Sequence, residues 1–174
     1  MLDPIQEELY AAWCKEAAAS GGVPPRAAFD PIDFPRTLPT LVLYELVEND
    51  AVCLRLVGTE IARAWGTDHT GHCLHEFMEG DYHDFIRGQV DQCVEQRVPI
   101  FSHSCFQWDR GRALDTRRLL LPYARNDDID KVGFVLLSQV FDYGKAGPSF
   151  PWVSIDSGFE FFELNRQTMT PTTE

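Results

Sequence analysis

Two features that define whole classes of protein are missing from this chain of 174 residues: a long hydrophobic run and an excess of basic charge. Nowhere do about 18 apolar residues follow one another, as a membrane-spanning helix requires. Lys and Arg number 15 against 27 Asp and Glu, and the resulting formal net charge of -12 repels nucleic-acid phosphates and anionic lipid headgroups. We therefore expect neither nucleic acid nor a membrane as a partner.

Signals for secretion and for cysteine chemistry are missing as well. The start of the chain, Met1 to Pro4, has no basic segment followed by an apolar one, so we expect a cytoplasmic protein. The number of cysteines is odd and no two form a C-x-x-C pair, which disfavours a disulfide framework and a zinc site. We expect reduced, mostly buried thiols at Cys14, Cys53, Cys73, Cys93 and Cys105.

The composition that is present, 44% hydrophobic and 24% charged, is typical of a single globular domain. At this length folding hides roughly 70% of the surface of the extended chain, so a core can form without disulfides or metal.

A first helix is predicted after Asp3, which can cap it, and before Gly21, which can end it. Its apolar residues recur every four positions and predict one buried face, made of Ile5, Leu9, Trp13 and Ala17.

Strands and one longer helix are predicted along the centre of the chain. Apolar patterns favour strands at 40–47, 52–57, 100–108, 114–123 and 132–143, and a helix at 82–97. Strands joined by short turns pair antiparallel, so we expect an α+β fold with one sheet.

The end of the chain differs in composition. A Gly-rich linker at 144–148 precedes a tail with five large aromatic residues, and we expect that tail to dock on the domain or on another chain. The aromatics are Phe150, Trp152, Phe159, Phe161 and Phe162. We predict disorder at 168–174, and three regions overall: an N-terminal helix at 1–22, a domain at 23–143 and the tail at 144–174.

Four motifs are informative in combination. They are D-P-I-D-F-P-R-T-L-P at 30–39, R-L-V-G-T at 55–59 followed by T-G-H at 70–72, V-P-I at 98–100, and R-R-L-L-L-P at 117–122. With the order of elements, they make residues 10–143 similar to the PAS sensory fold, in particular to the PAS family numbered five, whose members are short bacterial proteins. The resemblance implies a five-stranded antiparallel sheet around a pocket, with helices on one face. It also implies a sensory or regulatory module and leaves the ligand open.

Cofactor binding is disfavoured by the spacing of the candidate ligands. His69, His72 and His75 recur every third residue around Gly71, so their rings should diverge, and solvent-facing loop histidines are the reading that we prefer to a metal site. PAS relatives that bind haem use a histidine on the longer helix, where this chain offers only His83 at the very start. Of the flavin-binding motif of photosensory relatives, only the cysteine is matched, at Cys73. We expect no cofactor and a colourless protein.

An enzyme is a remote alternative. Cys105 and His103 lie two apart in a predicted strand and share one face, so a cysteine nucleophile with a histidine base is conceivable there or at Cys73. No nucleophile elbow, oxyanion loop or glycine-rich phosphate cradle accompanies them. We expect a protein that is not an enzyme, with a small hydrolase or isomerase as the remote alternative.

Two arginines interrupt otherwise apolar strands, at Arg55 and Arg118. Each could point inward and bind a carboxylate or phosphate of a metabolite. Alternatively, each could form an ion pair with Glu45, Asp115 or Glu60 on the outer face. Together with the aromatic residues expected around the PAS cavity and with a polar histidine, they give the candidate ligand-binding set Arg55, Trp65, Phe77, Phe85, Phe101, His103 and Arg118.

Two functions from different classes remain open. The first is a sensory module that binds a small molecule and signals to an unidentified protein through contacts between proteins. The second is a ligand-free interaction or dimerisation module with a closed cavity. Either version is expected to be a homodimer, built on the first helix through Ile5, Leu9 and Trp13 or on the aromatic tail.

Overall fold

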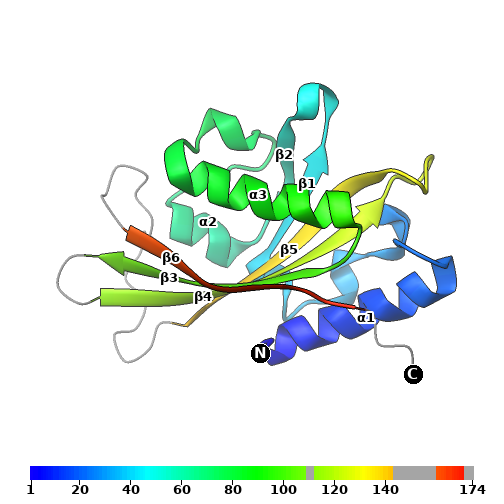
Figure 1. Cartoon of the computed structure of the whole chain (residues 1–174), viewed down its shortest axis with the longest axis horizontal. Helices are drawn as coiled ribbons and strands as arrows, with labels where there is room; N and C mark the ends of the chain where they lie inside the picture. Colours follow the sequence, from blue (N-terminus) through cyan, green and yellow to red (C-terminus); the bar gives the residue numbers. More distant parts are fainter. Residues whose placement is uncertain (109–111, 143–159, 171–174) are drawn as a thin grey trace.

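A six-stranded antiparallel sheet is the centre of the computed structural model, which describes residues 1–108, 112–142 and 160–170 (Figure 1). Its strands lie in the order β2-β1-β5-β4-β3-β6. Their bounds are Leu41–Leu46 (β1), Val52–Val57 (β2), Ile100–Trp108 (β3), Arg112–Ala124 (β4), Val132–Asp142 (β5) and Glu160–Thr168 (β6). With its helices, this sheet confirms the expected α+β, PAS-like fold.

Helices lie on both faces of the sheet. The α-helices are Pro4–Ser20 (α1), Thr59–Trp65 (α2) and Gly80–Gln96 (α3). Five short 3-10 turns connect the elements: Arg26–Ala28, Pro31–Asp33, Leu38–Thr40, Glu48–Asp50 and Leu74–Glu76. In Figure 1, α2 and α3 lie over one face and α1 under the other. Each face has its own hydrophobic cluster, so the sheet is buried on both sides.

The first helix forms where its capping residues predict it. The Asp3 carboxylate accepts the backbone N–H of Ile5 at 3.2 Å, and Gln6 returns a bond to the backbone N–H of Asp3 at 3.1 Å, which completes a capping box. Gly21 ends the helix with a φ of 69°, in the left-handed region that favours glycine.

The buried face of α1 packs on the chain's own sheet. Leu9 and Trp13 are each 2% exposed, and the Trp13 indole N–H donates to the Pro122 carbonyl at 2.8 Å. Gln6 is buried where the apolar stripe suggested Ile5, and it donates to the carbonyls of Arg117 and Ser138. The expectation that Leu9 and Trp13 form an interface between chains is therefore wrong, because the sheet already covers them.

A sixth strand was not expected and comes from the aromatic tail. β6 pairs with β3 over Ile100–Gln107, so this part of the tail docks on the domain, one of the two alternatives that the composition suggested. Thr168, expected to be disordered, is the last residue of the strand, and the backbone N–H of the following Met169 donates to the Pro99 carbonyl at 2.9 Å. Residues 144–148 of the linker and Phe150, Trp152 and Phe159 lie outside the described residues.

One pair of cysteines is oxidised, contrary to expectation. Cys53 in β2 and Cys73, 20 residues later, lie opposite each other in an isolated antiparallel bridge and form a disulfide. The odd cysteine count gave no indication of this pair, because the two residues meet only when the chain after α2 returns to the edge of β2. Cys14, Cys93 and Cys105 remain thiols.

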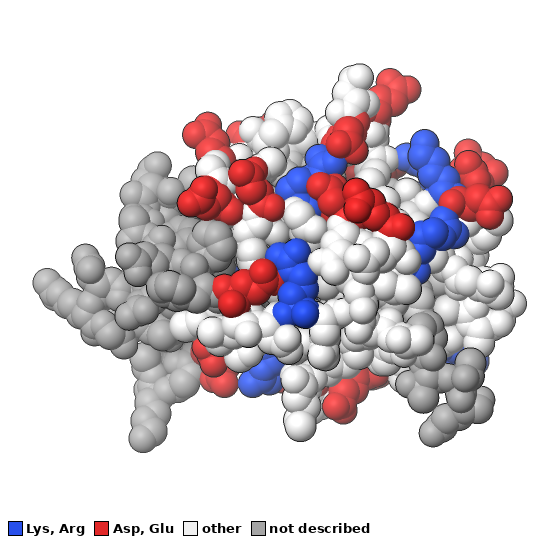
Figure 2. Space-filling model, viewed as in Figure 1, with Lys and Arg blue, Asp and Glu red and all other residues white. Residues whose placement is uncertain are grey.

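The surface charge agrees with the acidic composition. On the face drawn in Figure 2, red and blue groups lie side by side, without a continuous basic area. Among the described residues, no helix has the length and apolar character that crossing a membrane requires.

Candidate functional site

A charged side chain lies fully buried in the middle of the sheet. Arg118 of β4 is 0% exposed, and its neighbours across the sheet are Ser102 in β3 and Gln139 in β5. Its Nη1 donates to the Ser104 hydroxyl at 2.5 Å. Because guanidinium keeps its charge in proteins, this site holds a buried positive charge.

The alternation of β4 fixes the direction in which Arg118 points. Leu114 and Leu120 pack in the cluster under α2 and α3, whereas Leu119 and Leu121 pack in the cluster under α1. Arg118 is two residues from Leu120, so it faces α3. Of the two placements considered for this arginine, the structure has the inward one.

Aromatic side chains of α3 and β1 lie on the same face of the sheet as the guanidinium. Its central carbon lies 5.4 Å from the centre of the Phe85 ring, within the range of a cation–π contact, and the Tyr82 ring lies 6.3 Å from that of Phe85. Tyr44 is fully buried, and burial is the main reason that its pKa is raised, with the positive charge of Arg118 acting in the opposite direction. The Tyr44 hydroxyl is therefore neutral and able to donate.

Neutral polar side chains complete the site. Both amide atoms of Gln89 and the hydroxyls of Tyr44, Ser102 and Thr116 are buried without a hydrogen-bond partner in the described part of the chain, as is the amide oxygen of Gln139. Gln89 follows Phe85 by one helical turn on the buried face of α3. Each such group costs about 1–3 kcal/mol when nothing satisfies it. The arrangement can supply several hydrogen bonds to a polar molecule beside Arg118.

Trp65 and Phe77 belong to the same hydrophobic cluster as Phe85. The rings of Trp65 and Phe77 are 5.7 Å apart, and Phe77 stacks on His69 at 3.8 Å with an interplanar angle of 8°. Burial, and then the neighbouring His72, lowers the pKa of His69. Three of the four candidate aromatics, Trp65, Phe77 and Phe85, therefore lie on the α2 and α3 side of the sheet with Arg118.

Arg55, Phe101 and His103 lie elsewhere. Arg55 is half-exposed and pairs with Glu45, one of the partners considered for an outward arginine. Phe101 is next to Ile100, which packs under α3, so Phe101 faces the α1 side together with its neighbour Leu119. Its expected place above the sheet with Phe77 and Phe85 is wrong.

His103 also faces the α1 side, because it is two residues from Phe101. Its Nε2 lies 3.6 Å from a carboxylate oxygen of Asp115. The expectation that it contributes a polar group to the same pocket as Arg118 is wrong, since strand alternation separates them.

Neither cysteine considered as a nucleophile is in a reactive form. Cys73 is in the disulfide. Burial, followed by the hydrogen bond and charge of Asp115, raises the pKa of the Cys105 thiol, which reduces the thiolate fraction that nucleophilic attack needs.

The histidines considered for metal or haem lie in different surroundings: His69 stacks on Phe77, and His72 lies beside His69. His75 is exposed, and His83 is 25% exposed beside Asp84 at 3.0 Å. No group of three or more His, Cys, Asp or Glu side chains within the described ranges is placed to hold a metal ion.

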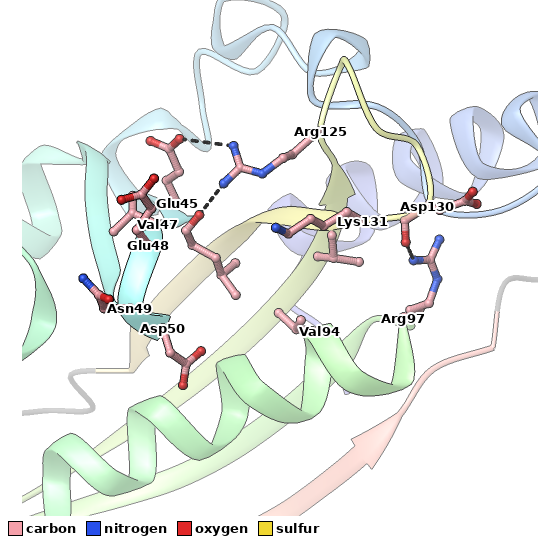
Figure 3. A pocket seen from close by; sticks show the side chains of 12 residues that line it. Glu45, Val47, Glu48, Asn49, Asp50, Val94, Arg97, Arg125, Asp130 and Lys131 are labelled. Carbon is pink, nitrogen blue, oxygen red and sulfur yellow. Dashed lines mark hydrogen bonds and ion pairs between the residues drawn. The ribbon is translucent and has the colours of Figure 1, made fainter.

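An open groove of about 870 Å³ lies at the other end of α3, between the turns after β1 and β4 (Figure 3). Arg125 donates to the Leu46 carbonyl at 2.5 Å and lies 3.8 Å from Glu45, and Arg97 bonds to the Asp130 carbonyl. None of the seven candidate ligand-binding residues lines this groove. Its two arginines are thus held by backbone carbonyls and, for Arg125, by Glu45.

Arg118 and its aromatic neighbours were among the residues predicted from the sequence, whereas the neutral polar groups were not. These are Tyr44, Gln89, Ser102, Ser104, Thr116 and Gln139. A signal was present: Ser102 and Ser104 in one strand, and Thr116 and Arg118 in the next, each occupy every second position, so each pair shares a face. The pairing of the two strands then brings all four together.

Comparison with known proteins gives a family match. The model of the fifth PAS family, described as a PAS domain, matches residues 1–136. No curated protein and no solved structure matches at a significant level.

Proposed function

The chain belongs to the PAS domain family, and from this premise we propose that it binds a small molecule with an anionic group at Arg118. PAS domains are sensory or regulatory modules, and this function applies to the chain at that general level. Beyond this general function, we propose where the ligand binds and which chemical group it carries. We also propose that binding is signalled through contacts with another protein.

The buried guanidinium among unsatisfied neutral groups is the observation that supports this proposal. Arg presents its N–H groups as a planar fork that fits a carboxylate or phosphate. Charge-assisted bonds of this kind are strengthened in a site shielded from water. Gln89, Ser102 and Thr116 could then bond to the remaining polar atoms of the ligand.

A ligand-free interaction module is the second candidate. Tyr82, Phe85 and Ile86 of α3 join the sheet residues in one continuous hydrophobic cluster, and such packing is also what a closed cavity would show. The two candidates differ in whether a small molecule stabilises the protein.

Non-enzymatic action, homodimerisation and a cytoplasmic location are further parts of the proposal. The raised pKa of Cys105 and the disulfide at Cys73 support the absence of cysteine catalysis. Because α1 covers its own sheet, we place the dimer contact on the aromatic tail. Sedimentation of the full chain at micromolar concentration should give a dimer, and a monomer would contradict this part.

The redox state of Cys53 and Cys73 in the cell tests the location. Disulfides are rare in the cytoplasm of most organisms. We expect alkylation of intact cells to trap this pair as thiols, whereas the purified protein in air should have thiols only at Cys14, Cys93 and Cys105. A pair that is fully oxidised in cells would contradict a cytoplasmic location.

Thermal unfolding with a panel of small carboxylates and phosphate esters tests the binding site. A ligand that binds only the folded state adds about 2.7 kcal/mol to the unfolding free energy at 100 times its dissociation constant. We expect at least one anion to raise the midpoint. Arg118→Gln should abolish the increase, and Arg55→Gln, which removes an exposed arginine from the same sheet, should leave it unchanged.

Cooperative unfolding of Arg118→Gln without ligand is the control for folding, and Arg118→Lys provides a second variant that keeps the charge but loses the fork. If no anion raises the midpoint, or if Arg118→Gln responds like the natural chain, sensing at Arg118 is wrong. The interaction module then takes its place.

A further inference from the structure

A second arginine approaches the same aromatic ring from the C-terminal strand. Arg166 of β6 lies opposite Ser102, and Ser102 is itself the neighbour of Arg118. The central guanidinium carbon of Arg166 is 5.7 Å from the centre of the Phe85 ring, against 5.4 Å for Arg118. Two positive charges therefore converge on Phe85, one fully buried and one partly exposed.

A β-bulge brings an acidic side chain to the same face. Asn165 pairs with His103 and Glu163 pairs with Ser104, so Leu164 has no partner in β3. Residues three apart in a regular strand face opposite sides, but this extra residue puts Glu163 and Arg166 on the side of Ser104 and Ser102. Bulges commonly re-aim side chains next to functional sites.

Glu163 occupies Arg166 in the way that a bound carboxylate would. Its two oxygens accept from Nε and from Nη2 of Arg166, the latter at 3.1 Å, which is a bidentate pair. Arg166 also donates to the Gln92 amide oxygen of α3 at 3.3 Å. Glu163 lies on the exposed side of the pair, so an incoming carboxylate can replace it without disturbing the buried core.

From this geometry we infer that the ligand is a small dicarboxylate, with one carboxylate on Arg118 and the other on Arg166 in place of Glu163. The inference rests on the proposed function, because it needs the Arg118 site. It makes β6 part of the site, and it assigns Arg166 as a ligand-binding residue and Glu163 as a competitor within the chain.

Calorimetric titration with matched acids tests the inference. Succinate and glutarate are the probes, and butyrate and valerate, which have the same chain lengths with one carboxylate, are the controls. We expect the dicarboxylates to bind more tightly. Arg166→Gln should weaken their binding by about tenfold or more, the usual effect of losing a hydrogen bond to a charged group, and should not change the binding of the monocarboxylates.

Glu163→Gln removes the competing carboxylate and should tighten dicarboxylate binding. Gln167→Ala is the matched control for disturbing β6, because Gln167 pairs with Phe101 on the other face and is exposed. Thermal unfolding of each variant without ligand establishes that it folds.

The outcomes separate this inference from the proposed function. If dicarboxylates and monocarboxylates bind equally and only Arg118→Gln weakens them, or if phosphate esters bind and the dicarboxylates do not, the dicarboxylate inference is wrong and the Arg118 site stands. If none of the anions binds at millimolar concentration, both are wrong.

Discussion

A positive charge at the centre of a sheet is unfavourable unless something in its surroundings compensates it. Replacing buried charged groups by apolar ones of similar volume is often neutral or stabilising. We therefore expect the unfolding free energy of Arg118→Met, without ligand, to be higher than that of the natural chain or within about 1 kcal/mol of it, although the variant loses the hydrogen bond to Ser104. Urea unfolding monitored by circular dichroism measures this.

The opposite result would give Arg118 a structural role. If Arg118→Met lost about 3–5 kcal/mol, as when one partner of a buried ion pair is removed, the guanidinium would be needed for the fold itself. Ser104→Ala is the matched control, because it removes the acceptor and leaves the charge in place.

The stability of the protein should depend on pH through the side chain of His69. Its pKa is lowered below the usual 6.5, first because burial disfavours the charged ring and then because of the charge of the neighbouring His72. The unfolded chain therefore takes up a proton at a higher pH than the folded chain does. Stability should fall as the pH falls from 6.5 towards the lowered folded-state pKa.

His69→Phe should reduce this pH dependence while keeping a ring to stack on Phe77. The measurement is the unfolding midpoint between about pH 5 and pH 7.5, with exposed His75→Gln as the control. If the natural chain and His69→Phe gave parallel curves, the titration of His69 would not affect folding.

At the scale of elements, the first helix acts as one wall of the core. Trp13→Ala should destabilise the protein by about 3–5 kcal/mol, as for other buried tryptophans, because Trp13 is 2% exposed and bonds to Pro122. Lys15→Ala, on the exposed side of the same helix, should change little. A Trp13 variant that kept its stability but dissociated from a dimer in sedimentation would contradict this placement.

Most elements could be predicted from the sequence because their signals are local. The Asp3 cap, Gly21 and apolar spacing specify α1, and the strands of the central sheet lie within a few residues of the expected ranges. β6 could not be predicted in this way. It is an edge strand, its polar residues face solvent at positions such as Asn165 and Gln167, and its partner β3 is distant in sequence.

The site residues could be predicted only as far as the alternation of side chains along a strand and the family resemblance determine them. Alternation alone separates His103 from Arg118 once the register of β3 and β4 is known, but the register itself depends on long-range packing. Arg55 and Arg118 look alike in sequence. They differ because β2 is at the edge of the sheet, where Arg55 reaches Glu45 in partial exposure, whereas β4 lies between two other strands.

At the scale of the whole molecule, the two faces of the sheet are packed differently. The α1 face is closed by apolar side chains and by the bonds of Gln6 and Trp13. The α3 face combines a hydrophobic cluster with the polar groups around Arg118. A molecule bound on that face would contact α3, β3, β4 and β6 together, so it could change the position of the tail relative to the domain and thereby the surface seen by a partner.

The most direct test of this account is the nuclear magnetic resonance signal of the Arg118 Nε–H, assigned by its absence in Arg118→Gln. The account predicts that this signal shifts during titration with the acids that raise the thermal midpoint, and that the signal of the exposed Arg55, assigned in the same way, does not. An unchanged Arg118 signal at saturating acid would contradict binding at the buried guanidinium.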